Sequence, residues 1–410
     1  MHVLFFADNF PPETNAPANR TYEHCARWVA AGHRVTVVTC APNFPSGVVQ
    51  EGYRNRLWHW EVVDGIDVLR VWSFISANEG FLARIVDFVS YMVSAAVASL
   101  FVARPDVIVA TSPQFFTLGV GWFAAKTRRR PWVLELRDIW PESIKAVGAM
   151  RQSFVIAWLE RLELFFYRSA DRIVAVAGSF RSILTARGID PAKIDIVTNG
   201  VDLDRFVPAD GAAERARLGL SDKLVVGYVG THGMAHALET ALEAADLAQR
   251  DAELADVHFL FVGDGARKKA LVEWASSHGL ANVTFLPSTD RDGVLRTYGV
   301  LDAAIVHLRR TELFDNVIPS KIFECMALGV PILMGVQGEA RRIVIEGGAG
   351  IAFESENAND LLRAIRSIRD HHLRSALSAG GVATASQYSR PSLAGRMRLI
   401  LEEVADRERH

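Results

Sequence analysis

Short apolar segments rich in Val, Ile and Phe alternate with longer helical stretches along almost the whole chain. This pattern is typical of parallel strands that are buried on both faces and joined by crossover helices. In the first half, strands are expected near residues 3–7, 35–39, 68–71, 107–110, 132–136, 172–175 and 194–198. The pattern then begins again, near residues 224–229, 258–262, 283–286, 303–306, 331–334 and 350–353. The chain is therefore expected to be an α/β protein with two parallel sheets.

The stretch between the two series is rich in turn-forming residues. Residues 199–202 (Asn-Gly-Val-Asp) follow the last expected strand of the first half, and a polar, Ala-rich segment continues to about Asp222. We place a hinge in this stretch. Two doubly wound, Rossmann-like domains joined there are expected to face a deep interdomain cleft, and a ligand in that cleft would contact both domains.

Residues 81–103 form the longest apolar stretch. As a helix it would be about 34 Å long, which is enough to cross a bilayer. A crossover helix on a parallel sheet has the same composition, and this stretch lies between the strands expected at 68–71 and 107–110. We therefore expect a packed or monotopic helix, with a membrane span as the alternative. The basic run at residues 126–130 (Lys-Thr-Arg-Arg-Arg) suits anionic lipid headgroups or, alternatively, a solvated face.

Composition narrows the class of protein. Of 410 residues, 50% are hydrophobic, and 45 Lys and Arg face 47 Asp and Glu, which disfavours disorder and a polybasic nucleic-acid binder. The cysteines, Cys25, Cys40 and Cys325, are far apart, which disfavours a disulfide framework or a thiolate zinc site and suits a reducing cytoplasm. The first residues lack the features of a signal peptide, so export is not expected.

Residues 318–331 carry the clearest candidate chemistry. A proline and Ser320 open a predicted helix, a glycine ends it, and a strand follows at once. The first turn would present N–H groups, Ser320 and Lys321 to an anion, with Glu324 one turn further on. This arrangement suits a nucleotide diphosphate and a ribose diol. The alternative is an ordinary capped helix with a solvated Lys and Glu.

Two shorter motifs lie in loops where a doubly wound fold binds ligands. They are residues 199–202 and residues 262–265 (Val-Gly-Asp-Gly), each of which follows an expected strand. Together with residues 227–233 (Gly-Tyr-Val-Gly-Thr-His-Gly) and 319–324 (Pro-Ser-Lys-Ile-Phe-Glu), they make the whole chain resemble a bacterial retaining glycosyltransferase of GT-B architecture, in the large family four. Residues 137–143 and 11–18 further resemble the N-acetylfucosaminyltransferase-like branch of O-antigen and capsule synthesis.

The resemblance implies a division of labour along the chain. Residues 1–205 would form the acceptor-binding domain and residues 206–385 the nucleotide-sugar domain, with a C-terminal helix over 386–410 returning to the first domain. The implied reaction moves a sugar, expected to be an N-acetylated or deoxy hexose, from a UDP donor to a polyprenyl-diphosphate-linked saccharide. The enzyme would work peripherally on an anionic membrane, at the inner face of the cytoplasmic membrane.

The resemblance also assigns residues on the donor side. Glu324 matches the second acid of the family's paired-Glu motif, which binds the ribose, while Asn316 stands where the first acid is usual. Asn316 leaves the sugar's identity open, because an amide both donates and accepts. His232 is either a phosphate contact or an ordinary loop histidine, and Arg267 and Lys268 assist or are solvated. The donor-binding set is Gly230, His232, Gly233, Gly263, Arg267, Asn316, Ser320, Lys321 and Glu324.

On the acceptor side the chain departs from the family pattern. Asn15 and Ala16 replace the usual Gly-Gly loop, and residues 137–138 (Arg-Asp) replace the family's histidine. Asp138 and Glu142 are either functional or helix caps. The acceptor-binding set is Asn15, Ala16, Arg20 and Glu142.

The implied mechanism is retaining transfer without a metal or cofactor. Asp138, Lys321 and Glu324 are the catalytic candidates, and Lys321 is the preferred cation for the departing diphosphate. Asp202 and Asp204 imitate a metal motif, but they match the family's interdomain turn, where Asp caps a turn.

Three other classes of function are alternatives to this one. A dinucleotide-dependent oxidoreductase is disfavoured because residues 7–12 (Ala-Asp-Asn-Phe-Pro-Pro) lack the glycine motif that such enzymes carry after their first strand. A GT-B relative that performs epimerisation or phosphorolysis, or that uses a soluble acceptor, stays open. So does a non-catalytic membrane-associated protein that uses the apolar helix.

Overall fold

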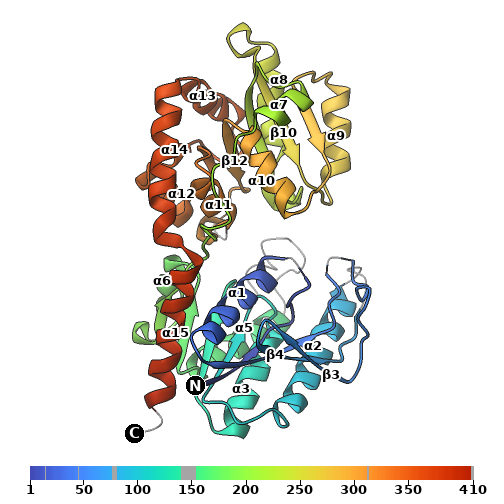
Figure 1. Ribbon diagram of the computed structural model, residues 1–410, viewed down its shortest axis with the longest axis vertical. Helices are drawn as coiled ribbons and strands as arrows, with labels where there is room; N and C mark the ends of the chain where they lie inside the picture. The colour runs from blue at the N-terminus through green and yellow to red at the C-terminus, as the bar shows by residue number, and fades with distance from the viewer. Residues whose placement is uncertain (14, 45, 76–80, 140–153, 312–313, 408–410) are drawn as a thin grey trace. The chain divides into compact units, whose positions relative to one another are not determined.

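The computed structural model describes residues 1–13, 15–44, 46–75, 81–139, 154–311 and 314–407. The chain divides into two compact units: unit 1 comprises Met1–Thr198 with Arg390–His410, and unit 2 comprises Asn199–Ser389 (Figure 1). The boundaries lie a few residues from those expected at 205/206 and 385/386. The reason is local: Val201 forms a parallel bridge to Ser389, and the Val201 N–H donates to the Tyr388 carbonyl at 3.0 Å. These contacts join the segment after residue 198 to the segment before residue 390, so both belong to unit 2.

Among its described residues, unit 1 has an eight-stranded sheet in the order β3-β4-β2-β1-β5-β6-β7-β8. All neighbours are parallel except β3, which pairs antiparallel with β4. The central strands are fully buried, which agrees with their continuous apolar sequences. The strands are β1 (His2–Phe6), β2 (Arg34–Cys40), β3 (Trp58–Val63), β4 (Ile66–Val71), β5 (Val107–Thr111), β6 (Trp132–Leu136), β7 (Arg172–Ala175) and β8 (Ile194–Ile196).

Strand β3 was not expected from the sequence. It forms a hairpin with β4 through Asp64 and Gly65, both at positive φ (47° and 80°), the backbone that two-residue hairpins require. Along β3 exposed residues alternate with half-buried ones, so Trp58, Trp60 and Val62 share one outward face.

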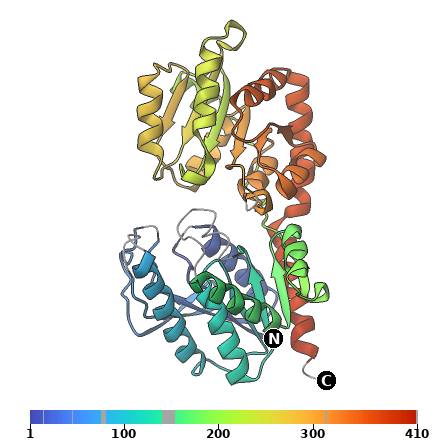
Figure 2. The same cartoon turned by 180° about the vertical axis from the view of Figure 1, so that it is seen from behind.

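The helices of unit 1 pack on both faces of this sheet. On one face, α15 runs along α1, and the Trp28 indole N–H donates to the Ala394 carbonyl at 2.9 Å (Figures 1 and 2). On the other face, α2 contacts α3, and α3 contacts α5. The helical segments are α1 (Ala16–Ala30), α2 (Phe81–Ser99), α3 (Phe116–Arg128), α5 (Phe154–Ser169), α6 (Gly178–Ala186), η1 (Pro191–Lys193) and α15 (Arg390–Arg407).

Helix α2 is the crossover between β4 and β5. Its Tyr91, Ala95 and Ala98 are buried, whereas Val93 and Val97 are exposed. In the part of the chain that the structure describes, none of the helices combines the length and apolar character needed to cross a membrane.

Among its described residues, unit 2 has a six-stranded parallel sheet in the order β11-β10-β9-β12-β13-β14. The strand order reverses between β9 and β12, and doubly wound folds bind ligands at the carboxyl ends of strands flanking such a point. The strands are β9 (Leu224–Val229), β10 (Val257–Val262), β11 (Val283–Leu286), β12 (Ala303–His307), β13 (Ile332–Gly335) and β14 (Gly350–Ala352).

Helices α8, α9 and α13 pack with one face of this sheet around a core that includes Leu242, Phe259 and Leu361. Helix α11 connects β12 to β13 and contacts α14. The helical segments are α7 (Ala212–Leu218), η2 (Met234–His236), α8 (Glu239–Gln249), η3 (Ala252–Leu254), α9 (Lys268–Ser277), α10 (Arg291–Val300), η4 (Phe314–Asn316), α11 (Lys321–Ala327), α12 (Gly338–Glu346), α13 (Ala358–Ile368), α14 (His371–Ala385) and η5 (Ser386–Tyr388).

Candidate donor site in unit 2

The loops after β9 and β10 touch each other through glycine backbone. Gly230 and Gly263 have φ of +140° and +145°, in a region that side chains rarely adopt. A Cβ on Gly263 would lie 1.9 Å from the Gly230 carbonyl oxygen, and the Gly230 N–H donates to the Val262 carbonyl at 2.9 Å. Only glycine at position 263 allows this approach, so the two loops form one continuous edge.

His232 lies inside this pair of loops. Its N–H donates to the Asp264 carbonyl at 2.8 Å, and its carbonyl accepts from the Arg267 N–H at 2.9 Å. The side chain is fully buried beside the rings of Tyr228 and Phe285. Neither ring nitrogen has a hydrogen-bond partner in the described structure. A buried polar group without partners is costly, so these two nitrogens are candidates for a contact to a bound ligand.

The electrostatics keep His232 neutral. Burial, together with the positive charge of Lys268, lowers the pKa of His232 to about 4. At pH 7 the ring therefore carries one N–H donor and one acceptor.

Lys321 is directed from the first residue of α11 at the loop after β9. Its ammonium donates to the Val229 carbonyl at 3.0 Å and lies 3.9 Å from the centroid of the Tyr228 ring. A Cβ on Gly230 would lie 2.9 Å from Lys321 Nζ, so the cation stands directly against the glycine loop. Burial lowers the pKa of Lys321 to about 8, against the charge of Glu324. An anion bound here would favour the charged ammonium.

Other donor-side candidates lie on the same segment of chain. Ser320 is the residue before α11, and its side chain makes no capping hydrogen bond. Glu324 is half-buried in the first turn of α11, and Asn316 is half-buried at the end of η4. Gly233 precedes the short turn η2 with φ of −100°, so its backbone does not require glycine.

Arg267 and Lys268 are both engaged within unit 2 rather than simply solvated. The Arg267 guanidinium pairs with the Glu239 carboxylate, with Nε 3.0 Å from Oε1. Lys268 donates to the carbonyls of Gly263 and Leu286 at 2.6 and 3.0 Å and so ties β10 to β11 at their ends. A donor phosphate would have to share the Arg267 guanidinium with the Glu239 carboxylate.

The acceptor-side candidates belong to unit 1. Asn15 caps α1, because its side chain accepts from the Ala18 N–H at 2.8 Å and also donates to Asn9. Ala16 is the exposed first residue of that helix. Asp138 is half-buried just after β6, with its N–H 3.2 Å from Ser112 Oγ. Glu142 lies outside the described residues.

Arg20 lies inside unit 1. Its side chain is only 8% exposed, and Nε donates to Glu135 Oε1 at 2.8 Å. Nη1 and Nη2 donate to the carbonyls of Thr198 and Val197 at 2.7 and 2.9 Å. All three nitrogens therefore have partners within unit 1, and Arg20 joins α1 to β6 and to the chain after β8. Its contact with an acceptor stays a prediction.

The carboxylate that pairs with Arg20 is held in its ionised form. Burial opposes ionisation of Glu135, but the charges of Arg20 and Arg137 outweigh it and lower the pKa of Glu135 to about 2. Breaking such a buried pair by removing one partner is strongly destabilising.

Sequence reasoning missed the environment of Asp8. Asp8 follows β1 at the carboxyl edge of the unit 1 sheet, and burial raises its pKa, opposed by Asn9 and by the charge of Arg137. Burial likewise lowers the pKa of Arg137 to about 10. The position after the first strand was a usable signal, because it lies at the carboxyl end next to the point where strand order reverses.

The aspartates that imitate a metal motif form a turn. Asp202 Oδ1 accepts from the Asp204 N–H at 3.2 Å, and the Asp202 carbonyl accepts from the Phe206 N–H at 2.9 Å. Throughout the described ranges, no three His, Cys, Asp or Glu side chains come together as a metal-binding group.

Two doubly wound units, the second with glycine loops and a lysine at its strand-order reversal, define a GT-B glycosyltransferase. The chain belongs to the family 4/group 1 glycosyltransferases: residues 15–200 match the glycosyl transferase 4-like domain, and residues 211–379 match glycosyl transferases group 1. It is thus a glycosyltransferase.

Relatives of known name support this assignment. The chain is 27% identical over 340 residues to WcaI of Escherichia coli (strain K12), named as a colanic acid biosynthesis glycosyl transferase, covering 80% of this chain and 82% of that protein. It is 33% identical over 232 residues to a D-inositol 3-phosphate glycosyltransferase of Geodermatophilus obscurus, covering 54% of this chain. The match spans about half of that relative's length (50%).

Solved structures share the fold. Alr3699/HepE of Anabaena in complex with UDP has a TM-score of 0.74 at 19% identity and covers 98% of this chain and 100% of that one. Sucrose-phosphate synthase of Thermosynechococcus elongatus has a TM-score of 0.75 at 18% identity, covering 98% of each chain.

Proposed function

We propose that this glycosyltransferase moves an N-acetylated or deoxy hexose from a UDP donor to a polyprenyl-diphosphate-linked saccharide in surface polysaccharide synthesis, as in the N-acetylfucosaminyltransferase-like branch. The observation that carries the donor side is the ammonium of Lys321, held against the Gly230 loop beside an unpartnered His232. Two relatives add support: HepE was solved with UDP-glucose, and WcaI is named for colanic acid biosynthesis.

In this proposal the diphosphate lies along the Gly230–Gly233 loop. Lys321 places a positive charge where negative charge develops as the bond between the sugar's anomeric carbon and the diphosphate breaks. Neutral His232 donates its one N–H to a phosphate oxygen, which gives the ring the partner that it lacks. Glu324 accepts hydrogen bonds from the ribose hydroxyls, and the Asn316 amide contacts the sugar.

The transfer step needs no group besides donor, acceptor and protein. The acceptor hydroxyl oxygen bonds to the anomeric carbon on the face that the diphosphate leaves, so the configuration is retained. The hydroxyl proton passes to the departing diphosphate oxygen, and Lys321 stabilises the charge that remains. Asp138, after β6, is the candidate for orienting the acceptor. Since Lys321 supplies the cation, we propose that the reaction is independent of metal ions.

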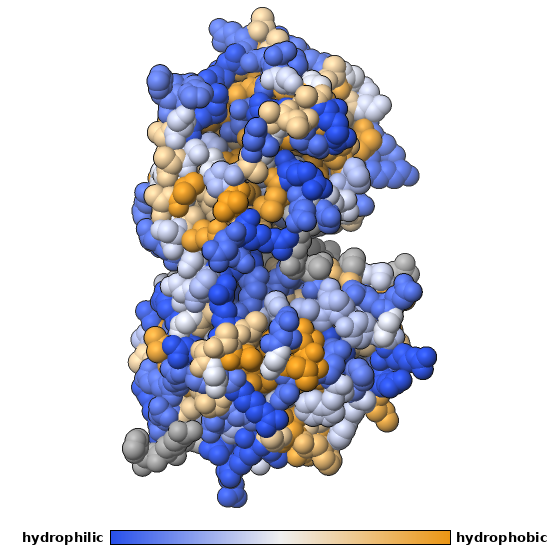
Figure 3. Space-filling model, viewed as in Figure 1, coloured by the Kyte–Doolittle hydropathy of each residue, from blue (hydrophilic) through white to orange (hydrophobic). Residues whose placement is uncertain are grey.

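The membrane part of the proposal rests on a surface of unit 1. We define the β3–α2 surface by its exposed side chains, Trp58, Trp60, Val62, Val93, Val97 and Phe101. Trp58 and Phe101 are in contact, with ring centroids 4.9 Å apart, so the strand and the end of the helix form one surface. Figure 3 shows apolar side chains gathered among polar ones on the face of unit 1 that it presents. An exposed apolar patch of this kind suits an interaction site.

The basic run lies next to this surface. Arg128 donates to the carbonyls of Leu100 and Val102 at 3.1 and 2.6 Å, which fixes the end of α3 against the chain that carries Phe101. Lys126 and Arg129 are exposed there. Apolar side chains beside Lys and Arg suit reversible attachment to an anionic bilayer, where a lipid-linked acceptor is found.

A soluble, phosphorylated acceptor is the second candidate, because relatives 33% identical over about half their length are named for D-inositol 3-phosphate. The deciding experiment offers labelled UDP-sugars with either a polyprenyl-diphosphate-linked saccharide or inositol 3-phosphate. Label in the lipid fraction supports the proposal. Label only in the soluble product favours the second candidate.

A further inference from the structure

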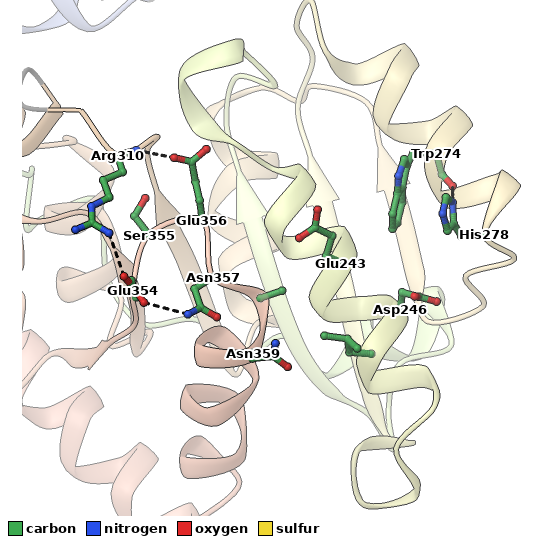
Figure 4. A pocket seen from close by; sticks show the side chains of 12 residues that line it. Glu243, Asp246, Trp274, His278, Arg310, Glu354, Ser355, Glu356, Asn357 and Asn359 are labelled. Carbon is green, nitrogen blue, oxygen red and sulfur yellow. Dashed lines mark hydrogen bonds and ion pairs between the residues drawn. The ribbon is translucent and has the colours of Figure 1, made fainter.

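A second concave region lies on unit 2, and none of the donor-site candidates line it. This basin has a volume of about 680 Å³, within the range of about 300–1,000 Å³ typical of small-molecule sites. Its floor includes Glu243 and Leu247 of α8, and α9 contributes Trp274 and His278 on one side. Opposite them lies the loop from Glu354 to Asn359, after β14 and at the start of α13 (Figure 4). We call it the Trp274 basin.

Trp274 presents a fixed aromatic face. Its ring is stacked on the ring of His278, with centroids 3.8 Å apart and planes at 16°, and His278 Nδ1 lies 2.9 Å from the Trp274 carbonyl. Figure 4 shows His278 on one side of the indole and the basin on the other. The indole is half-buried, and its N–H has no partner among the described residues. One face and one donor are thus available to a ligand.

The opposite wall is held in place by its own hydrogen bonds. Glu354 pairs with Arg310 at 3.0 Å and accepts from the Asn357 amide at 3.0 Å. Glu356 accepts from the Arg310 N–H at 2.9 Å. Its backbone has a φ of +59°, which costs free energy in a residue other than glycine. Its N–H donates to His307 Nε2 at 3.0 Å, and this bond helps to hold that conformation.

The charges disfavour an anionic ligand, because the carboxylates of Glu243 and Glu356 have no cation partner within the described residues. Asp246 is paired with Arg250 at 2.7 Å, and Glu354 is paired with Arg310, so these carboxylates are already neutralised. Glu243 and Asn359 are exposed and have no partner in the described part of the chain. An aromatic face, a free indole N–H, an amide and a carboxylate offer both donors and acceptors beside an apolar plane. A pyranose ring has the matching chemistry, with C–H groups on one face and hydroxyls at its edge.

We propose that the Trp274 basin is a carbohydrate-binding site, separate from the donor site, for a pyranose unit of an uncharged oligosaccharide. The sugar ring stacks on the free face of Trp274. Its hydroxyls donate to Glu243 and exchange hydrogen bonds with the Asn359 amide and the wall formed by Glu354 and Asn357. The assignment does not depend on which donor or acceptor the enzyme uses.

The test is saturation-transfer NMR on the full chain with maltotriose, chitotriose and β-1,4-galactotriose as probes, each titrated to obtain its affinity. At least one probe is expected to bind. Trp274→Ala should weaken that binding about tenfold and Glu243→Gln about threefold, as the loss of a stacking face or of one hydrogen bond implies. Trp158→Ala, an exposed indole of α5, and Glu273→Gln, the neighbour of Trp274, are matched controls that should bind as the wild type does.

Three results would overturn the proposal: no probe binds, Trp274→Ala binds as Trp158→Ala does, or saturating UDP displaces the probe. If hexalysine binds through Trp274 and none of the sugars does, the basin is a cation site instead. Trp274→Phe retains an aromatic face and is the control for loss of binding through misfolding. Its affinity for the probe should lie between those of the wild type and of Trp274→Ala, and its unfolding temperature should be unchanged.

Discussion

The proposed donor site depends most on Lys321, whose environment predicts a pH dependence. Burial lowers its pKa from the ordinary value of 10.5 to about 8. Between pH 8 and 10.5 the unfolded chain holds a proton at this lysine that the folded chain has released. The contribution of Lys321 to the free energy of unfolding therefore rises with pH across that window. Below about pH 8 the buried lysine is charged, and its burial destabilises the fold by the full amount.

A diphosphate changes this balance, because it interacts with the charged ammonium. UDP affinity should therefore fall as pH rises through and above about 8, and Lys321→Ala should abolish that dependence while reducing turnover about 100- to 1,000-fold. Calorimetry across pH 6.5 to 10 with both proteins measures it. A wild-type affinity that is flat across this range would remove Lys321 from the diphosphate.

Glu324 is expected to contact the ribose. Glu324→Ala should weaken UDP binding by about 1.5 to 3 kcal/mol, the range for hydrogen bonds to a charged group. Glu346→Ala, at an exposed site on α12, is the control and should leave the affinity unchanged. Equal UDP affinities for the two variants, measured by calorimetry, would exclude Glu324 from the nucleotide site.

At the residue scale, the arrangement of side chains can be predicted from the sequence where neighbours in space are also neighbours along the chain. Ser320, Lys321 and Glu324 lie within one turn and a half of helix, so their common direction follows from their spacing alone. The ion pair of Arg20 could not be predicted, because its partner, Glu135, is 115 residues away and only the fold brings the two together. The burial of Asp8 beside Arg137 was missed for the same reason.

Among the elements, the buried strands were predictable and the edge strand was not. The central strands are buried on both faces and read as continuous apolar runs. Strand β3 is half exposed, and its Trp58-His59-Trp60-Glu61 sequence mixes polar and aromatic residues, so it does not stand out as a core strand. The hairpin turn at Asp64 and Gly65 was the signal that could have found it.

The contact between the loops after β9 and β10 is testable through Gly263. Gly263→Ala would place a Cβ 1.9 Å from the Gly230 carbonyl and force the loops apart, so UDP binding should fall at least tenfold and stability by about 1–3 kcal/mol. Gly395→Ala, in helix α15 with nothing within 4 Å of its Cβ, should be neutral or slightly stabilising. Urea unfolding measures the change in stability, and calorimetry measures the change in UDP affinity. A Gly263→Ala protein that binds UDP normally would contradict the loop geometry.

For the molecule as a whole, the β3–α2 surface predicts reversible membrane attachment. The triple variant Trp58→Ala, Trp60→Ala, Phe101→Ala should bind vesicles containing anionic lipid about tenfold or more weakly, because it removes large apolar area from the contact. Raising salt above about 0.1 M, where the Debye length is about 10 Å, should release part of the wild type.

Sedimentation with vesicles measures this binding, and the double variant Val272→Ala, Val382→Ala, with two exposed apolar side chains of unit 2, is the control. Unfolding temperatures verify that the triple variant folds. If the triple variant sediments as well as the control, the surface is not the membrane contact. A chain that never binds such vesicles would count against the lipid-linked acceptor.

The transfer reaction itself tests the central claim most directly. The full chain is incubated with labelled UDP-N-acetylhexosamines and UDP-linked deoxyhexoses and a polyprenyl-diphosphate-linked saccharide in vesicles, with and without EDTA, and the product is analysed by mass spectrometry and NMR. The account predicts one labelled lipid-linked product with the anomeric configuration of its donor, formed equally well in EDTA and about 100- to 1,000-fold more slowly by Lys321→Ala. Inversion at the anomeric carbon, activity that needs added manganese, or a Lys321→Ala enzyme with the wild-type rate would contradict it.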